Sequence, residues 1–251
     1  MNKKADVVIV GTGVAGLFSA LNLPDDKEII MITKSDAESS DSFLAQGGIC
    51  VLRDEQDYDS YFEDTMRAGH YENRKESVDI MIRSSGKIIE DLVGYGVEFE
   101  KDGEAFAYTR EGAHSRPRIL FHADVTGKEI TSKLLARVRE KNNVTIYEYT
   151  TMTDILEENG KCAGITVKTK SGEESSIYAD YTILASGGIG GLYQHSTNFP
   201  HLTGDALEVA KKHHIRLEHL DYVQIHPTTL YSEKPGRRFL ISESIRGEGA
   251  L

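Results

Sequence analysis

Residues 5–23 read ADVVIVGTGVAGLFSALNL, and this stretch decides the fold of the chain. Its first six residues are mostly β-branched or apolar and predict a short buried strand. Residues 17–23 continue at helical propensity until Pro24, and residues 28–33 predict a second strand. The order strand, glycine turn, helix, strand is the context in which a G-x-G-x-x-G motif indicates a dinucleotide site.

The three glycines of this motif have separate expected roles. Gly11 makes the tight turn, Gly13 lets the backbone approach a pyrophosphate, and Gly16 lets the helix pack closely on the strand. The helix N-terminus supplies unpaired N–H groups and the positive end of a dipole to the phosphates. The motif therefore predicts a bound dinucleotide rather than a glycine-rich turn without a ligand.

The residues after the second strand leave the kind of dinucleotide open. The expected ribose-binding acid is missing there, Thr33-Lys34-Ser35 stands in its place, and Asp36 comes a little late. A lysine suits the 2′-phosphate of NADP. It suits equally a place beside the adenosine of a flavin nucleotide.

The rest of the chain predicts a parallel sheet that carries an antiparallel insertion. Residues 39–49 are rich in small residues and are expected to form a loop without helix or strand. Apolar spacing predicts helices over residues 58–68, 77–93 and 126–141. The first two are expected to be surface helices without a catalytic or binding role. Strands are expected over residues 144–147, 152–156, 162–169, 175–178 and 181–185. Asn159-Gly160 and Ser171-Gly172 are typical hairpin turns, so the strands around them form a small meander.

Composition limits the classes of partner. The chain has 251 residues, 39% hydrophobic and 27% charged, which is enough for one large or two modest domains. Its net charge of −11 argues against nucleic acid as a partner. Apolar runs fall far short of the roughly 18 residues of a membrane span, and no secretory leader precedes the first strand. Two cysteines, Cys50 and Cys162, fit a reducing, cytoplasmic setting.

Short motifs along the whole chain carry a family resemblance. They occupy residues 11–16, 45–49, 185–188, 203–205, 226–228 and 246–249. In this order they resemble the flavoprotein family of succinate dehydrogenase, fumarate reductase and L-aspartate oxidase. Within the family, residues 109–115 (TREGAHS), followed by Arg118-Ile119-Leu120, resemble the L-aspartate oxidases. The implied fold is α/β: a Rossmann-like FAD-binding domain over residues 1–219, with the start of a capping domain over residues 220–251.

The resemblance implies FAD as the cofactor, held without a covalent bond. In the membrane-associated members, a histidine five residues before the loop glutamine is joined to the flavin. Asp41 stands at that place here, and an aspartate cannot form the histidyl linkage. Lys34 is expected beside the adenosine, and residues 42–48 along the isoalloxazine. The cofactor-binding residues implied in this way are Gly11, Thr12, Gly13, Val14, Ala15, Gly16, Lys34, Asp41, Ser42, Phe43, Leu44, Ala45, Gln46, Gly47, Gly48, Met152, Ala185, Ser186, Gly187 and Asp205.

The implied reaction is hydride transfer from Cα of L-aspartate to flavin N5, which gives iminoaspartate, with reoxidation by oxygen or fumarate. His226 and Ser242 are expected to hold a substrate carboxylate, and Glu111 to orient the substrate amine. Glu243 and Arg246 match a proton path in the fumarate reductases, although an i,i+3 surface ion pair is the plainer alternative. For His226 the plainer alternative is a turn histidine with a structural hydrogen bond. The remaining histidines lack the spacing of metal ligands, and no metal is expected.

Family members continue beyond the last residue, so the chain is expected to be the N-terminal portion of such an enzyme and inactive alone. The implied role is NAD biosynthesis, with quinolinate synthase as a possible partner and no membrane contact. The alternatives are a fumarate reductase or succinate dehydrogenase type of flavoprotein, and an FAD-binding fragment without catalysis.

Overall fold

The computed structural model describes residues 2–226, 228–234 and 236–241. These described residues divide into two compact units: the first from the ranges 2–43 and 134–240, and the second from residues 44–133 with residue 241.

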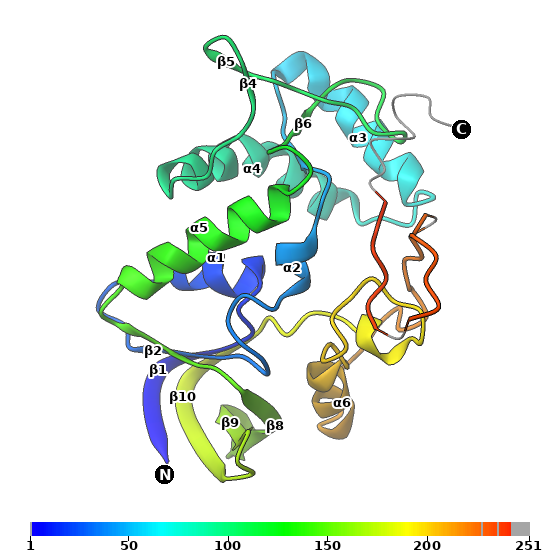
Figure 1. The fold of residues 1–251 in the computed structure, drawn as a ribbon. Helices are drawn as coiled ribbons and strands as arrows, with labels where there is room; N and C mark the ends of the chain where they lie inside the picture. Colours follow the sequence, from blue (N-terminus) through cyan, green and yellow to red (C-terminus); the bar gives the residue numbers. More distant parts are fainter. Residues whose placement is uncertain (1, 227, 235, 242–251) are drawn as a thin grey trace. The chain divides into compact units, whose positions relative to one another are not determined.

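The first unit is built on one six-stranded sheet (Figure 1). The strands, in spatial order, are β7 (Val144–Tyr147), β2 (Ile29–Ile32), β1 (Lys3–Val10), β10 (Glu174–Leu184), β9 (Lys161–Thr169) and β8 (Thr150–Glu158). The first four are parallel, and β9 and β8 continue the sheet in antiparallel pairing. This arrangement confirms the predicted α/β fold with its parallel sheet and antiparallel meander.

Strand β10 differs from the prediction of two separate strands over residues 175–178 and 181–185. It is one strand that pairs with β9 in antiparallel fashion over Glu174–Tyr178 and with β1 in parallel fashion over Ile177–Leu184. The physical reason is that neither glycine nor proline interrupts the chain at residues 179–180, and both edges of the strand find partners. The meander is therefore an extension of the parallel sheet.

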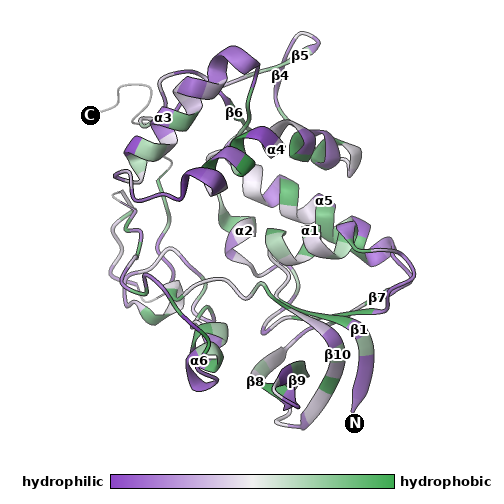
Figure 2. Cartoon of the chain, turned by 180° about the vertical axis from the view of Figure 1, so that it is seen from behind, coloured by the Kyte–Doolittle hydropathy of each residue, from purple (hydrophilic) through white to green (hydrophobic). Residues whose placement is uncertain are grey.

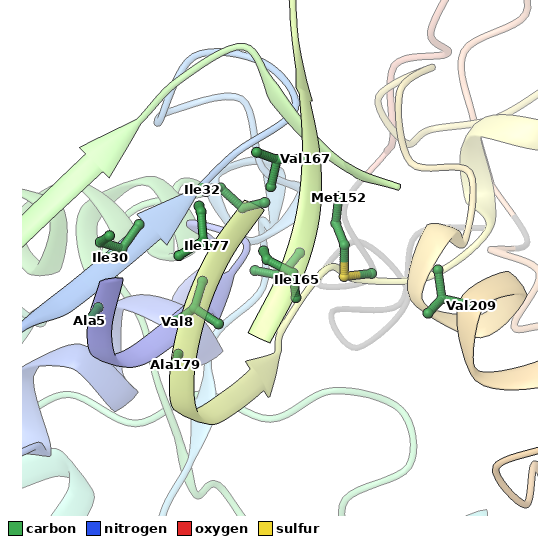
Figure 3. Packing of buried hydrophobic residues seen from close by; sticks show 11 residues of the cluster. Ala5, Val8, Ile30, Ile32, Met152, Ile165, Val167, Ile177, Ala179 and Val209 are labelled. Carbon is green, nitrogen blue, oxygen red and sulfur yellow. The ribbon is translucent and has the colours of Figure 1, made fainter. Parts of the chain in front are cut away.

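The core of the first unit joins both halves of this sheet (Figure 3). Val8 and Ile30 come from the parallel strands, and Ile165 comes from the meander. Met152 at the start of β8 is 3% exposed, and it packs with Val209 of α6 (Asp205–Lys212) in this cluster. Helix α6 packs on β8. The start of β8 and the residues just before α6 are therefore fixed relative to each other.

The helices largely follow the expected positions. They are α1 (Val14–Asn22), α2 (Asp41–Leu44), α3 (Tyr58–Ala68), α4 (Lys75–Gly94), α5 (Thr126–Glu140) and α6. Helix α4 buries residues spaced three or four apart, among them Val78, Ile82 and Ile89, and hydrophobic and hydrophilic residues alternate along its ribbon (Figure 2). Within the described ranges, no helix has the length and apolar character that crossing a bilayer requires.

The prediction of a featureless loop over residues 39–49 was wrong. Helix α2 forms one turn there, with Asp41 in its first turn and a hydrogen bond of 3.0 Å from the Phe43 N–H to the Ser40 carbonyl. In the second unit, β3 (Ile49–Cys50) pairs with β6 (Ile119–Leu120). This pairing is set by partners 71 and 69 residues away (120 − 49 and 119 − 50), and local composition does not reveal it. A separate short hairpin joins β4 (Lys101–Asp102) to β5 (Ala105–Phe106).

Candidate functional site

A cavity of about 260 Å³ lies in the first unit where β1 and β2 end and where the chain leaves β10. This is the edge at which doubly wound sheets bind dinucleotides. The structure brings most of the sequence-predicted cofactor residues to this one cavity. Those that line it are Gly11, Thr12, Gly13, Val14, Ala15, Lys34, Asp41, Ser42, Met152, Ala185, Ser186, Gly187 and Asp205.

The glycine turn shows why two of its positions lack a side chain. Gly11 has φ +115°, and a Cβ there would stand 2.2 Å from the carbonyl oxygen of Ala185. A Cβ on Gly16 would stand 2.1 Å from the carbonyl oxygen of Gly11. Gly11 therefore passes against the end of β10, while Gly16 packs the helix on the turn and does not line the cavity.

The residues present suit a phosphate-bearing cofactor. Gly13 caps α1 without a side-chain hydrogen bond to the helix, and the Val14 N–H donates to Ser42 Oγ at 3.1 Å. The buried hydroxyl of Ser40, which also lines the cavity, has no hydrogen-bond partner within the described part of the chain. Helix N–H groups, the helix dipole and an unsatisfied hydroxyl thus meet at one wall, as binding of a pyrophosphate requires.

Lys34 also lines the cavity and is engaged by two residues of the 203–205 motif. Its Nζ lies 2.7 Å from Thr203 Oγ1 and 2.9 Å from Asp205 Oδ2, and the Thr203 hydroxyl donates to Asp205 at 2.6 Å. The carboxylate neutralises the lysine and would repel a 2′-phosphate. Of the two alternatives that the sequence left open, this pair favours the adenosine of a flavin nucleotide.

Asp41 is held by the segment before α6. One carboxylate oxygen accepts from the Phe199 N–H at 3.1 Å, and the other accepts from the Asn198 amide. Burial raises the pKa of the Asp41 carboxyl, against the opposing effect of the Phe199 N–H. His201 supports the same segment, since its Nε2 lies 2.9 Å from the Ser39 carbonyl oxygen.

Sequence reasoning missed a further group of residues that line the cavity. They are Val10, Ile32, Thr33, Ser39, Ser40, Thr150, Thr151, Gly188, His201, Leu202, Thr203 and Gly204. Thr203 and Gly204 stand directly before Asp205 in a motif that the sequence displays, so a signal for them existed. His201 and Ser40 reach the cavity only through the tertiary fold.

In the second unit, Glu111 packs against the glycine loop at residues 46–48. A Cβ on Gly47 would stand 2.9 Å from Glu111 Oε1, and one on Gly48 would stand 2.3 Å from the Leu120 carbonyl oxygen. Thr126 Oγ1 donates to the Gly47 carbonyl oxygen at 2.6 Å. The buried Oε1 of Gln46 has no hydrogen-bond partner among the residues that the structure covers. The Glu111 carboxylate and the Gln46 amide oxygen therefore both lie at the closely packed glycine loop.

The remaining predicted residues are placed as follows. Phe43 belongs to the first unit without lining its cavity, and residues 44–48 belong to the second unit. The ring of His226, in the first unit, has its Nδ1 2.9 Å from the Thr228 carbonyl oxygen. Ser242, Glu243 and Arg246 lie outside the described residues.

Comparison with protein families and curated sequences gives one consistent match. A family described as FAD binding domain matches residues 6–251. The chain is 47% identical over 250 residues to an L-aspartate oxidase of Clostridium perfringens, which covers 99% of this chain and 57% of that protein. It is 44% identical to an L-aspartate oxidase of Clostridium acetobutylicum, covering 99% of this chain and 58% of that protein. The chain thus spans about half the length of these relatives.

Solved structures share the fold. A quinol–fumarate reductase with menaquinol molecules superposes with a TM-score of 0.91 at 27% identity, covering 99% of this chain and 44% of that one. An E. coli quinol fumarate reductase superposes with a TM-score of 0.89 at 26% identity, covering 99% and 43%.

Proposed function

This chain belongs to the family of FAD binding domains, and from that premise we propose that the whole protein oxidises L-aspartate to iminoaspartate. FAD is its cofactor, and the protein is a flavin-dependent oxidoreductase of the succinate dehydrogenase and fumarate reductase type. The relatives named L-aspartate oxidase and the segment at residues 109–115 support the choice of substrate.

The observation that carries the proposal is the carboxylate of Glu111 against the glycine loop at Gly47. An anionic acceptor is the partner that a substrate ammonium group needs, and a charge-assisted hydrogen bond of this kind is strong and directional. Succinate and fumarate have no ammonium group. Glu111 therefore supplies a reason for the protein to prefer aspartate.

Other residues complete the proposed site. When bound, FAD would supply the acceptor for a hydride from Cα of the substrate, with oxygen or fumarate as the final electron acceptor. His226 and Ser242 hold a substrate carboxylate, and Glu243 and Arg246 form a proton path. Residues 1–219 then serve as the FAD-binding domain and residues 220–251 as the start of a capping domain. We place the protein in the cytoplasm and in NAD biosynthesis, with quinolinate synthase as the enzyme that receives the product.

A fumarate-reducing or succinate-oxidising flavoprotein is the second candidate, because two solved structures that share the fold at 26% and 27% identity are quinol–fumarate reductases. Two residues argue against this second candidate. Asp41 stands where the membrane-associated members carry their flavin-linked histidine, and Glu111 offers a charge that succinate does not need.

The experiment that tests the proposal is Glu111→Gln in the full-length protein. Loss of a charged hydrogen bond costs about 1.5–3 kcal/mol, so kcat/KM for aspartate should fall roughly 10- to 100-fold. Fumarate reduction should change less than about three-fold, since fumarate lacks an amine. Glu104→Gln, at an exposed turn of the same unit, is the matched control and should alter neither rate. An equal loss of both activities in Glu111→Gln would show that Glu111 is structural.

A further inference from the structure

The segment that carries Glu111 ends at a fully buried arginine, Arg118. Arg118 is 0% exposed, and its Nε and Nη2 donate to the two carboxylate oxygens of Asp57 at 3.0 and 2.9 Å. Its Nη1 donates to Asp64 Oδ2 at 2.7 Å. Asp57 stands immediately before α3 and Asp64 lies within it, so the guanidinium is fixed from one helix.

Asp64 is bound to the Glu111 segment at a second place. The same oxygen, Oδ2, accepts from the Ser115 N–H and from the Ser115 hydroxyl, each at 2.7 Å. Its other oxygen accepts from Arg67 at 2.7 Å. The Asp64 side chain is 5% exposed, and both of its oxygens are occupied.

The segment between these anchors is short. Thr109 and Ile119 exchange backbone hydrogen bonds of 2.9 and 3.1 Å, which closes a loop over residues 110–118. Within it, the His114 N–H donates to the Glu111 carbonyl at 3.0 Å. His114 Nε2 also lies 3.2 Å from the thiol of Cys50 on β3. The backbone on both sides of Glu111 is therefore tied to neighbouring elements.

From these contacts we propose that Asp64 is a positioning residue that sets the place of Glu111 through Ser115 and Arg118. Asp64 does not touch the substrate. It holds the loop that carries the Glu111 carboxylate. It therefore determines how strongly the site prefers an ammonium-bearing substrate over one without an ammonium group. This inference rests on the proposed function, because Glu111 acts on an amine only if aspartate is the substrate.

The chemistry of the cluster supports positioning rather than simple cohesion. Replacing buried ion pairs by apolar residues of similar volume is often neutral or stabilising, so cohesion alone does not require them. A forked arginine between two carboxylates fixes direction as well as distance. A displacement of about 1 Å at a substrate-orienting group costs on the order of 100-fold in rate, which is the precision that such a clamp supplies.

Asp64→Asn and Ser115→Ala in the full-length protein test the proposal. Asp64→Asn should lower kcat/KM for aspartate roughly 10-fold, mainly through KM, because the misplaced group binds the amine. Fumarate reduction should change less than about three-fold. Ser115→Ala should shift the ratio of the two activities in the same direction, and Ser115→Thr, which keeps the hydroxyl, should restore it. Asp59→Asn, at an exposed position of α3, is the control.

Flavin content and unfolding midpoint are measured for every variant. Equal loss of both activities in Asp64→Asn, or an unchanged activity ratio in Ser115→Ala, would overturn the proposal. If Asp64→Asn does not fold, the two Ser115 variants decide alone. The proposed function fails if the wild-type protein does not oxidise aspartate. It also fails if Glu111→Gln leaves the ratio of aspartate oxidation to fumarate reduction unchanged. A changed ratio in Glu111→Gln with an unchanged one in Ser115→Ala means that only the role of Asp64 has failed.

Discussion

Arg118, Asp57 and Asp64 place three charges where water does not reach, and each is paired. Burial raises the pKa of Asp64. This effect is outweighed by the hydrogen bonds from the Ser115 N–H, the Arg118 guanidinium and the Ser115 hydroxyl, so the pKa falls to about 2. The same arginine helps to lower the pKa of Asp57, against the effect of burial. At the scale of single residues, the second unit therefore depends on carboxylates that must stay ionised.

This dependence predicts how stability changes with pH. The pKa of Asp64 is lower in the folded chain than the value of about 3.9 in unfolded peptides. Its ionisation therefore contributes about 2 kcal/mol that is complete above roughly pH 4 and is lost as the pH falls toward 2. In urea unfolding, Asp64→Asn should be destabilised by about 3 kcal/mol at pH 7, and the difference from wild type should narrow in acid. A difference that stays constant from pH 7 to pH 2.5 would contradict this account, and Asp59→Asn serves as the reference.

The residues that line the cavity carry a signal in the sequence where they stand in motifs, and little signal where distant segments meet. Gly11 and Ala185 are recognisable from their neighbours. The contact of Lys34 with Asp205 joins residues 171 apart, and it favours a flavin nucleotide over NADP. Arg118 and Asp64 carry no local signal, because a charged residue in a sequence is ordinarily a solvated one.

At the scale of elements, periodicity located the long helices and strands. Helix α3 begins and ends at the expected residues, and β10 was located although it was divided in two. The elements that were not predicted include the eight-residue helix α6 and several short pieces, among them α2 and β3, of four and two residues. Such short pieces form because a partner such as β6 completes their hydrogen bonds, and local propensity contributes little.

Two glycines of the second unit give opposite predictions. A Cβ on Gly48 would stand 2.3 Å from the Leu120 carbonyl oxygen, so Gly48→Ala must separate β3 from β6. We expect a loss of about 2 kcal/mol or more in unfolding free energy, together with reduced flavin content. Gly86 lies inside α4 with nothing within 4 Å of an added Cβ, so Gly86→Ala should gain roughly 0.5–1 kcal/mol. Equal stability of the two variants would contradict the close packing of the glycine loop.

At the scale of the whole molecule, the residue at position 41 decides how FAD is expected to be held, because an aspartate cannot form a histidyl linkage to the flavin. Asp41 lines the cavity at the end of the parallel strands, and its carboxylate is engaged by Asn198 and by the Phe199 N–H. After acid precipitation of the full-length protein, the flavin absorbance should therefore move into the supernatant. Colour that stays in the pellet would show a covalent link and would favour the succinate and fumarate branch of the family.

The most direct test of the central claim is anaerobic mixing of the full-length flavoprotein with L-aspartate and, separately, with succinate. The visible flavin band should disappear with L-aspartate and persist with succinate, because Glu111 provides an acceptor for the ammonium group. Bleaching by succinate but not by L-aspartate, or by neither, would contradict the assignment of L-aspartate as the substrate.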